Sequence, residues 1–199
     1  MSPKLMRPLG WKGALSAMGI SVLWGGNIVA IKIALQEIQP LMMAGLTFFL
    51  GTLSILLWTC LNRIPIRPSR EEIVHHLING LLFTLQVALF YLGTYLTSAS
   101  HTVILTNTNI FFVALLAHFF ISEDRLTLLK IFGLGLAFMG VAYLFFDQPS
   151  LHSEASLSGN LVVLMSAFLL GVRIIYVKRI IERIESTRVV LWQMLIGVP

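Results

Sequence analysis

Arg173 is a residue whose type suggests chemistry, because it is a charged side chain within the apolar run SAFLLGVRIIYVK. A guanidinium in hydrocarbon costs at least about 2.5–3.5 kcal/mol unless it is paired, and the apolar runs of the sequence contain no acidic side chain. A partner would then come from water, from further helices or from a substrate, and a guanidinium binds carboxylates well. The alternative is snorkelling, since Arg173 lies about 10 Å from the nearer end of its run at helical rise.

Amides, hydroxyls and aromatic rings are the other groups in these runs that suit a small polar solute. They form two stripes at helical spacing, which consist of Asn79, Gln86 and Gly93 in one run and Ser98, Thr102, Thr106 and Asn109 in the next. Such groups donate and accept hydrogen bonds, so they suit a zwitterionic or polyhydroxylated solute. Threonines alternatively bond to their own helix backbone.

A third polar face lies in the first apolar run, where Trp24, Asn27 and Ile31 share one side of a helix. This face either lines a cavity or packs against a neighbouring helix, with Gly25 and Gly26 allowing a close approach. The predicted substrate-binding residues are Trp24, Asn27, Gln86, Thr102, Thr106, Asn109 and Arg173.

Catalytic and metal-binding patterns are absent from the sequence. It contains no carboxylate pair within an apolar run, no glycine-rich phosphate loop and no His/Cys cluster, and Cys60 is its single cysteine. We therefore expect no enzyme, no metal and no cofactor. His118 is a candidate for a proton-linked role, with a partly solvated histidine as the alternative.

The elements that must position these residues are membrane-spanning helices. Hydrophobic residues make up 57% of the chain and charged residues 12%, and the mean hydropathy is +0.87. About 20 apolar residues cross a bilayer as a helix. The sequence predicts spans at 13–34, 40–61, 73–96, 99–121, 128–146 and 159–180, with a seventh beginning near Arg188. The fold class is therefore an all-α, multi-pass helical bundle in a membrane.

Basic residues predict the orientation of these spans. All fourteen lysines and arginines except Lys32 and Arg173 fall in the N-terminal segment or near alternate loops, on one side of the membrane. The positive-inside rule puts that side, and the N-terminus, in the cytoplasm. The formal net charge of +5 then faces anionic lipid and implies no nucleic acid. We expect a location in the cell (inner) membrane.

A weak internal repeat divides the chain into residues 1–150 and 151–199. Sliding the sequence by 146 residues, the difference between 25 and 171, aligns several residues without a gap: Gly13 with Gly159, Gly25 with Gly171, Asn27 with Arg173, Lys32 with Lys178 and Gly51 with Gly197. Five spans separate the copies, and an odd number inverts the second copy. Inverted repeats with a substrate site near the midplane are common in secondary transporters.

The sequence resembles the EamA family of the drug/metabolite transporter superfamily. The matching motifs are Leu23-Trp24-Gly25-Gly26-Asn27 with Ala30-Ile31-Lys32, Tyr95–Ser100, and Asp124–Thr127 with Gly133 and Gly140. The resemblance implies ten helices in two inverted five-helix repeats, and transport of small metabolites such as amino acids.

Three positions depart from the family pattern. Thr47 stands where an arginine is common, Asn109 where a proline is common, and Asp124 where glutamate is usual. We expect Asn109 to make the fourth helix straighter than in relatives, because proline kinks helices. Arg188–Pro199 supplies 12 residues, about 18 Å at helical rise, so we expect the chain to be C-terminally truncated within its seventh helix.

These observations predict a secondary transporter, an exporter of small metabolites that works by alternating access. Its expected partners are a small-molecule substrate and the lipid bilayer. The alternative is a non-transporting membrane scaffold or accessory subunit derived from a truncated transporter.

Overall fold

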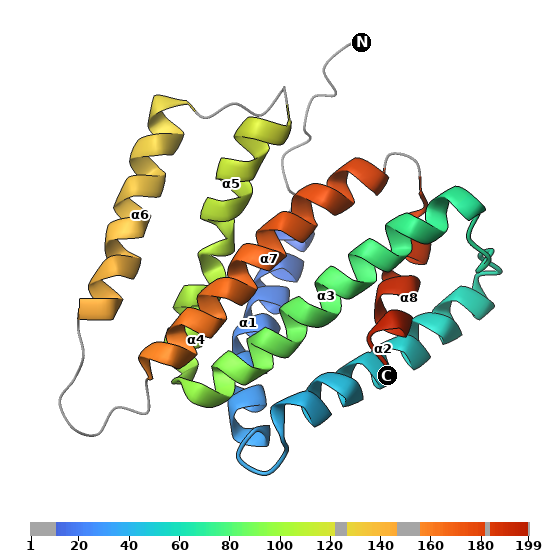
Figure 1. The fold of residues 1–199 in the computed structure, drawn as a ribbon, viewed down its shortest axis with the longest axis horizontal. Coiled ribbons are helices and arrows are strands. Elements are labelled where there is room, and N and C mark those ends of the chain that lie inside the picture. Colours follow the sequence, from blue (N-terminus) through green and yellow to red (C-terminus); the bar gives the residue numbers. More distant parts are fainter. Residues whose placement is uncertain (1–10, 122–126, 147–155, 182–183, 199) are drawn as a thin grey trace.

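The structure, a computed structural model, describes residues 11–121, 127–146, 156–181 and 184–198. Within these residues it contains helices and no strands (Figure 1). The helices are α1 (Trp11–Ala34), α2 (Pro40–Leu61), α3 (Arg70–Leu96), α4 (Ala99–Asn107), α5 (Asn109–Phe120), α6 (Leu128–Phe146), α7 (Leu157–Ile181) and α8 (Ser186–Ile196). Five helical spans of the described chain are long and apolar enough to cross a membrane, so the all-α multi-pass fold is confirmed.

Local signals explain where the helices begin. Pro40 starts α2, a position at which a missing N–H costs nothing. At α3 the Ser69 hydroxyl accepts from the Glu72 N–H, and the Glu72 carboxylate accepts from the Ser69 N–H. This capping box extends α3 three residues beyond the predicted start at 73, because the polar first turn is helical without being apolar.

The fourth span is interrupted at Thr108. The Thr108 N–H donates to the Leu105 carbonyl at 3.1 Å, and the Phe111 N–H donates to the Thr108 carbonyl at 2.9 Å, both over three residues instead of four. Asn109, expected to favour a straight helix, therefore does not make this span continuous. Asp124 lies outside the described residues, as do the predicted boundary at 150 and most of the loop at 147–158.

Pairwise contacts between helix ends agree with spans that run in alternate directions. At one end of the bundle the start of α3 meets the start of α8 through Glu72 and Arg188. At the opposite end, the end of α1 meets the end of α3 through Lys32, whose ammonium donates to the carbonyls of Thr94, Tyr95 and Thr97 at 2.7–3.1 Å. Lys32 thereby satisfies carbonyls at the negative end of the α3 dipole.

The antiparallel pair α3 and α7 forms the centre of the bundle (Figure 1). A glycine lets the two backbones touch, because a Cβ on Gly93 would lie 2.6 Å from Cγ2 and 2.8 Å from the backbone nitrogen of Val163. Similarly, a Cβ on Gly171 would lie 2.8 Å from Cβ of Phe112 in α5. Small residues at such crossings are the usual means of helix association in membranes.

Helices α2 and α8 meet through a pair of reciprocal contacts. A Cβ on Gly51 would lie 3.0 Å from Sδ of Met194, and one on Gly197 would lie 2.8 Å from the ring of Phe48. Under the shift of 146 residues, Phe48 corresponds to Met194 and Gly51 to Gly197. The two contacts therefore exchange with each other, as contacts across a two-fold axis do.

Helices α1 and α6 lie at the periphery of the described bundle. In the described part of α1 only Ile28 and Ile31 are buried. Helix α6 stands beside α4 and α5 at the left of Figure 1. Between them is an open cavity of about 910 Å³, lined mainly by apolar side chains and by Gly133 and Gly140. This cavity contains none of the predicted substrate-binding residues.

Candidate functional site

Arg173 lies inside the bundle and is held by neutral groups from two other helices. Its Nη1 donates to Oε1 of Gln193 in α8 at 2.9 Å, and its guanidinium carbon lies 4.5 Å from the centre of the Phe83 ring in α3. The Gln193 oxygen also accepts from Nδ2 of Asn79 at 3.1 Å. Among the described residues no carboxylate pairs with Arg173. Gln193 therefore accepts one hydrogen bond from Arg173 and does not neutralise its charge.

The Arg173 cluster, defined here as Asn79, Phe83, Arg173 and Gln193, keeps unused hydrogen-bonding capacity. Nε of Arg173 and Oδ1 of Asn79 are buried and have no hydrogen-bond partner within the described chain. A cation beside a free donor and a free acceptor is suited to a ligand that carries a carboxylate and a donor group. The Arg173 side chain reaches towards α8 and α3.

His76 extends this polar face of α3 towards the helix start. His76, Asn79, Phe83 and Gln86 follow one another at spacings of three or four residues, so they share one side of the helix. The imidazole of His76 stacks on Trp192, with ring centres 5.9 Å apart and an angle of 30°. It is 2% exposed, and neither ring nitrogen has a hydrogen-bond partner within the described residues.

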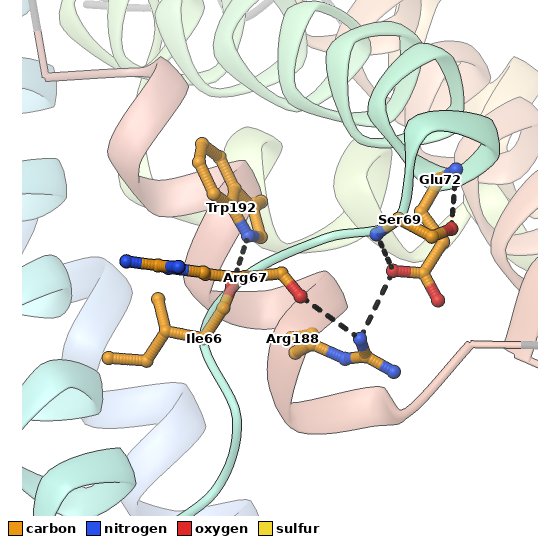
Figure 2. A network of polar contacts seen from close by, with 6 residues as sticks. All are labelled: Ile66, Arg67, Ser69, Glu72, Arg188 and Trp192. Atoms are coloured by element: carbon orange, nitrogen blue, oxygen red, sulfur yellow. Dashed lines mark hydrogen bonds and ion pairs between the residues drawn. The ribbon is translucent and has the colours of Figure 1, made fainter.

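A network beside His76 ties α8 to the segment between α2 and α3. In Figure 2 the Arg188 guanidinium lies between the Glu72 carboxylate, at 3.1 Å, and the Arg67 carbonyl, at 3.4 Å. The Trp192 indole N–H donates to the Ile66 carbonyl at 3.2 Å. We call Ile66, Arg67, Glu72, Arg188 and Trp192 the clasp. It closes the end of the bundle where, by the charge pattern, we expect the cytoplasm.

A second polar contact lies nearer the opposite end. The hydroxyls of Thr47 in α2 and Tyr91 in α3 share a hydrogen bond of 2.7 Å. Thr47 corresponds to Gln193 under the shift of 146 residues. Each of the two residues bonds to α3, Gln193 towards its start and Thr47 towards its end.

The predicted residues fall into three groups. Arg173 and Gln86 lie on the facing sides of α7 and α3. Gln86 is buried, and its backbone carbonyl accepts from the Ser166 hydroxyl at 2.8 Å. Thr102 is buried, and its hydroxyl donates to the Ser98 carbonyl at 3.0 Å. This is the bond to the threonine's own helix backbone that the sequence left as the alternative. The Thr106 hydroxyl is buried without a partner among the described residues, and Asn109 is half-buried at the start of α5.

Trp24 and Asn27 form the third group and lie apart from the others. Both are exposed on α1, Trp24 by 64%, and only Ile31 of their predicted face is buried. Gly25 and Gly26 have no other described atom within 4 Å of the position of a Cβ. The described residues therefore do not bring this face to Arg173.

Sequence reasoning missed Gln193 and His76. Gln193 is the polar residue in the apolar stretch VVLWQMLI. A polar side chain within a membrane segment is the signal that could have identified it. His76 lies next to His75, one turn after the charged start of α3, where a polar residue is not unusual. No group of three or more His, Cys, Asp or Glu side chains that could hold a metal occurs among the described residues.

The class of protein is thus a multi-pass helical membrane protein with an arginine between its central helices that no carboxylate of the described residues neutralises. The EamA-like transporter family matches residues 11–146, and the chain belongs to this family. It is 25% identical over 187 residues to "Uncharacterized transporter YoaV" of Bacillus subtilis (strain 168), covering 94% of this chain and 64% of that protein. It is 29% identical over 196 residues to "Probable amino-acid metabolite efflux pump" of Escherichia coli (strain K12), covering 94% and 61%. The chain thus spans less than two thirds of the length of these relatives. No solved structure matches it.

Proposed function

We propose that the protein is a secondary transporter that exports small metabolites such as amino acids, with Arg173 as a contact for the substrate carboxylate. The observation that carries the proposal is the guanidinium between α3, α7 and α8, bound by the neutral Gln193 and without a carboxylate partner in the described chain. Membership of the EamA-like transporter family and a relative named as an amino-acid metabolite efflux pump support it.

The Arg173 cluster offers complementary groups for an amino acid. The guanidinium has donors left for the carboxylate, and the free Oδ1 of Asn79 can accept from the ammonium group. Gln86 lies about one turn beyond Phe83 and adds an amide on the same face of α3. Trp24, Asn27, Thr102, Thr106 and Asn109 remain predicted contacts.

Alternating access is the mechanism that we propose, by rocking of two inverted repeats at 1–150 and from 151 onward. The reciprocal contacts of Gly51 with Met194 and of Gly197 with Phe48 support an axis between α2 and α8. Helix α3 bonds to Gln193 through Asn79 towards its start, and to Thr47 through Tyr91 towards its end. Opening one contact while the other stays closed would expose the cluster to one side at a time.

The test is amino-acid export from cells that carry the intact protein, compared with its Arg173→Gln and Arg173→Lys variants. Arg173→Gln removes a charge-assisted contact worth about 1.5–3 kcal/mol, so we expect export to fall at least about 10-fold. Arg173→Lys keeps the charge without the planar fork and should retain part of the export. The amount of each variant in the membrane fraction is the control for insertion.

Two results would contradict the proposal. Equal flux with and without the intact protein, across a broad panel of metabolites, would favour the non-transporting scaffold or accessory subunit. Unchanged export by Arg173→Gln, with transport otherwise present, would remove Arg173 from the substrate contacts.

A further inference from the structure

His76 is a titratable side chain in a position that gives it no hydrogen-bond partner among the described residues. It is 2% exposed, and both of its ring nitrogens are buried and unpartnered there. A neutral imidazole carries one donor and one acceptor, so a buried and unpartnered one is costly and calls for a function. His76 lies about 9 Å into α3 at helical rise, close enough to the end of the bundle to exchange a proton with water.

The charges that face His76 come from its own helix and from the helices packed against it. On α3 this is Glu72, with His75 adjacent in the chain. On α8 the charge is Arg188, and on α7 it is Arg173, which reaches the same face through Gln193. Tyr176 and Arg179 of α7 lie with His75 and Glu72 around a cavity of about 540 Å³, and α2 has no charged residue.

His75 contrasts with its neighbour. Its Nδ1 shares a hydrogen bond of 2.8 Å with the Tyr176 hydroxyl, and its side chain is exposed. Two consecutive histidines of one helix thus differ in burial and bonding, which supplies a matched control.

Protonation of His76 would act on the clasp. Glu72 lies one turn before His76 on the same face of α3 and accepts from Arg188 at 3.1 Å. An imidazolium needs two acceptors, and the nearest carboxylate on that face is Glu72. A positive charge on His76 would therefore compete with Arg188 for this carboxylate. His76 stacks on Trp192, whose indole N–H donates to the Ile66 carbonyl. A shift of the imidazole would therefore also disturb this hydrogen bond of the clasp.

We propose that His76 is a proton-binding site whose protonation releases the clasp between α8 and the α2–α3 segment. Burial disfavours the imidazolium in the closed state more than in an open, hydrated one, so a falling pH shifts the population towards the open state. In the transport cycle proposed above, on which this role rests, the proton would be the coupling ion. No substrate is needed to test it.

The first measurement is the fluorescence of the purified intact protein between pH 8.5 and pH 5. An imidazolium stacked on an indole quenches the indole fluorescence. The signal of Trp192, taken as the difference between the wild type and Trp192→Phe, should therefore fall as the pH is lowered through this range. His76→Gln should abolish this titration, and His75→Gln should keep it. A pH-independent Trp192 signal in the wild type, or a titration that survives His76→Gln, would overturn the proposal.

The second measurement is the distance across the clasp. Spin labels on Asn62→Cys and Ser186→Cys, in a Cys60→Ser background, sit at exposed positions on the two sides that the clasp joins. Pulsed electron paramagnetic resonance should show a longer and broader distance at pH 5.5 than at pH 8, and no change in the His76→Gln background. An unchanged distance in a protein whose Trp192 titrates would show that protonation does not open the clasp. Absent transport with both signals intact would instead overturn the proposed function.

Discussion

Gln193 decides how Arg173 is held, because its single oxygen accepts from both Arg173 and Asn79. Replacing it with leucine would leave a buried donor of Asn79 and a half-buried donor of Arg173 unpaired. Because each buried unsatisfied group costs about 1–3 kcal/mol, we expect Gln193→Leu to destabilise the protein by at least that amount. Thermal unfolding of the intact protein in detergent measures this directly.

Gln193→Glu is the matched variant, since it keeps the shape and the acceptor and adds a charge. It would give Arg173 an internal carboxylate, so we expect unfolding at or above the wild-type temperature together with loss of export. Unfolding of Gln193→Leu at the wild-type temperature would show that Gln193 does not hold Arg173.

Single residues also show what the sequence can and cannot reveal about a site. Arg173 was identified because a charge in an apolar run is rare and costly. Its partners were not, because Gln193 lies 20 residues away on another helix and Asn79 lies 94 residues away. Trp24 and Asn27 were predicted with equal reason from helical spacing, yet spacing only tells which residues share a face and not what that face meets.

The helices are held together where glycines remove the side chain between them. Gly93 is one such point between α3 and α7, since a Cβ added there would lie 2.6 Å from Cγ2 of Val163. The backbone nitrogen of Val163 would lie almost as close, and it cannot move aside as a flexible side chain would. We expect Gly93→Ala to cost about 1–3 kcal/mol, the usual range for overpacking, and thermal unfolding in detergent measures it.

Gly135→Ala in α6 is the control for this prediction, because nothing lies within 4 Å of its Cβ position in the described structure. It should leave the unfolding temperature within error or raise it slightly, since alanine favours helices over glycine. Equal effects of the two substitutions would show that α3 and α7 do not cross in close contact at Gly93.

Most helix bounds were predictable to within a few residues, because apolar length and capping residues are local signals. The break at Thr108 was not. It arises without proline or glycine, from a threonine whose hydroxyl returns to the Leu105 carbonyl at 2.6 Å. Helix pairing was likewise beyond the sequence, since Gly25 and Gly171 occupy equivalent positions and only Gly171 is packed in the described residues.

The molecule as a whole is organised by the alternation of its spans, which the charge pattern predicted and the contacts between helix ends agree with. Glu72 with Arg188 marks one end, and Lys32 with the α3 carbonyls marks the other. The orientation of these ends in a membrane is a prediction of the positive-inside rule. It places the segment between α2 and α3 in the cytoplasm and the turn between α1 and α2 outside.

Cysteine labelling of intact cells tests this orientation with two exposed positions, Gln36 between α1 and α2 and Asn62 after α2. In a Cys60→Ser background, a maleimide that cannot cross membranes should label Gln36→Cys from outside and should label Asn62→Cys only after permeabilisation. The reverse pattern would place the basic loops outside. It would also place the clasp, and with it the His76 proton site, on the outer face, so that the proton which releases the clasp would have to come from the outer medium.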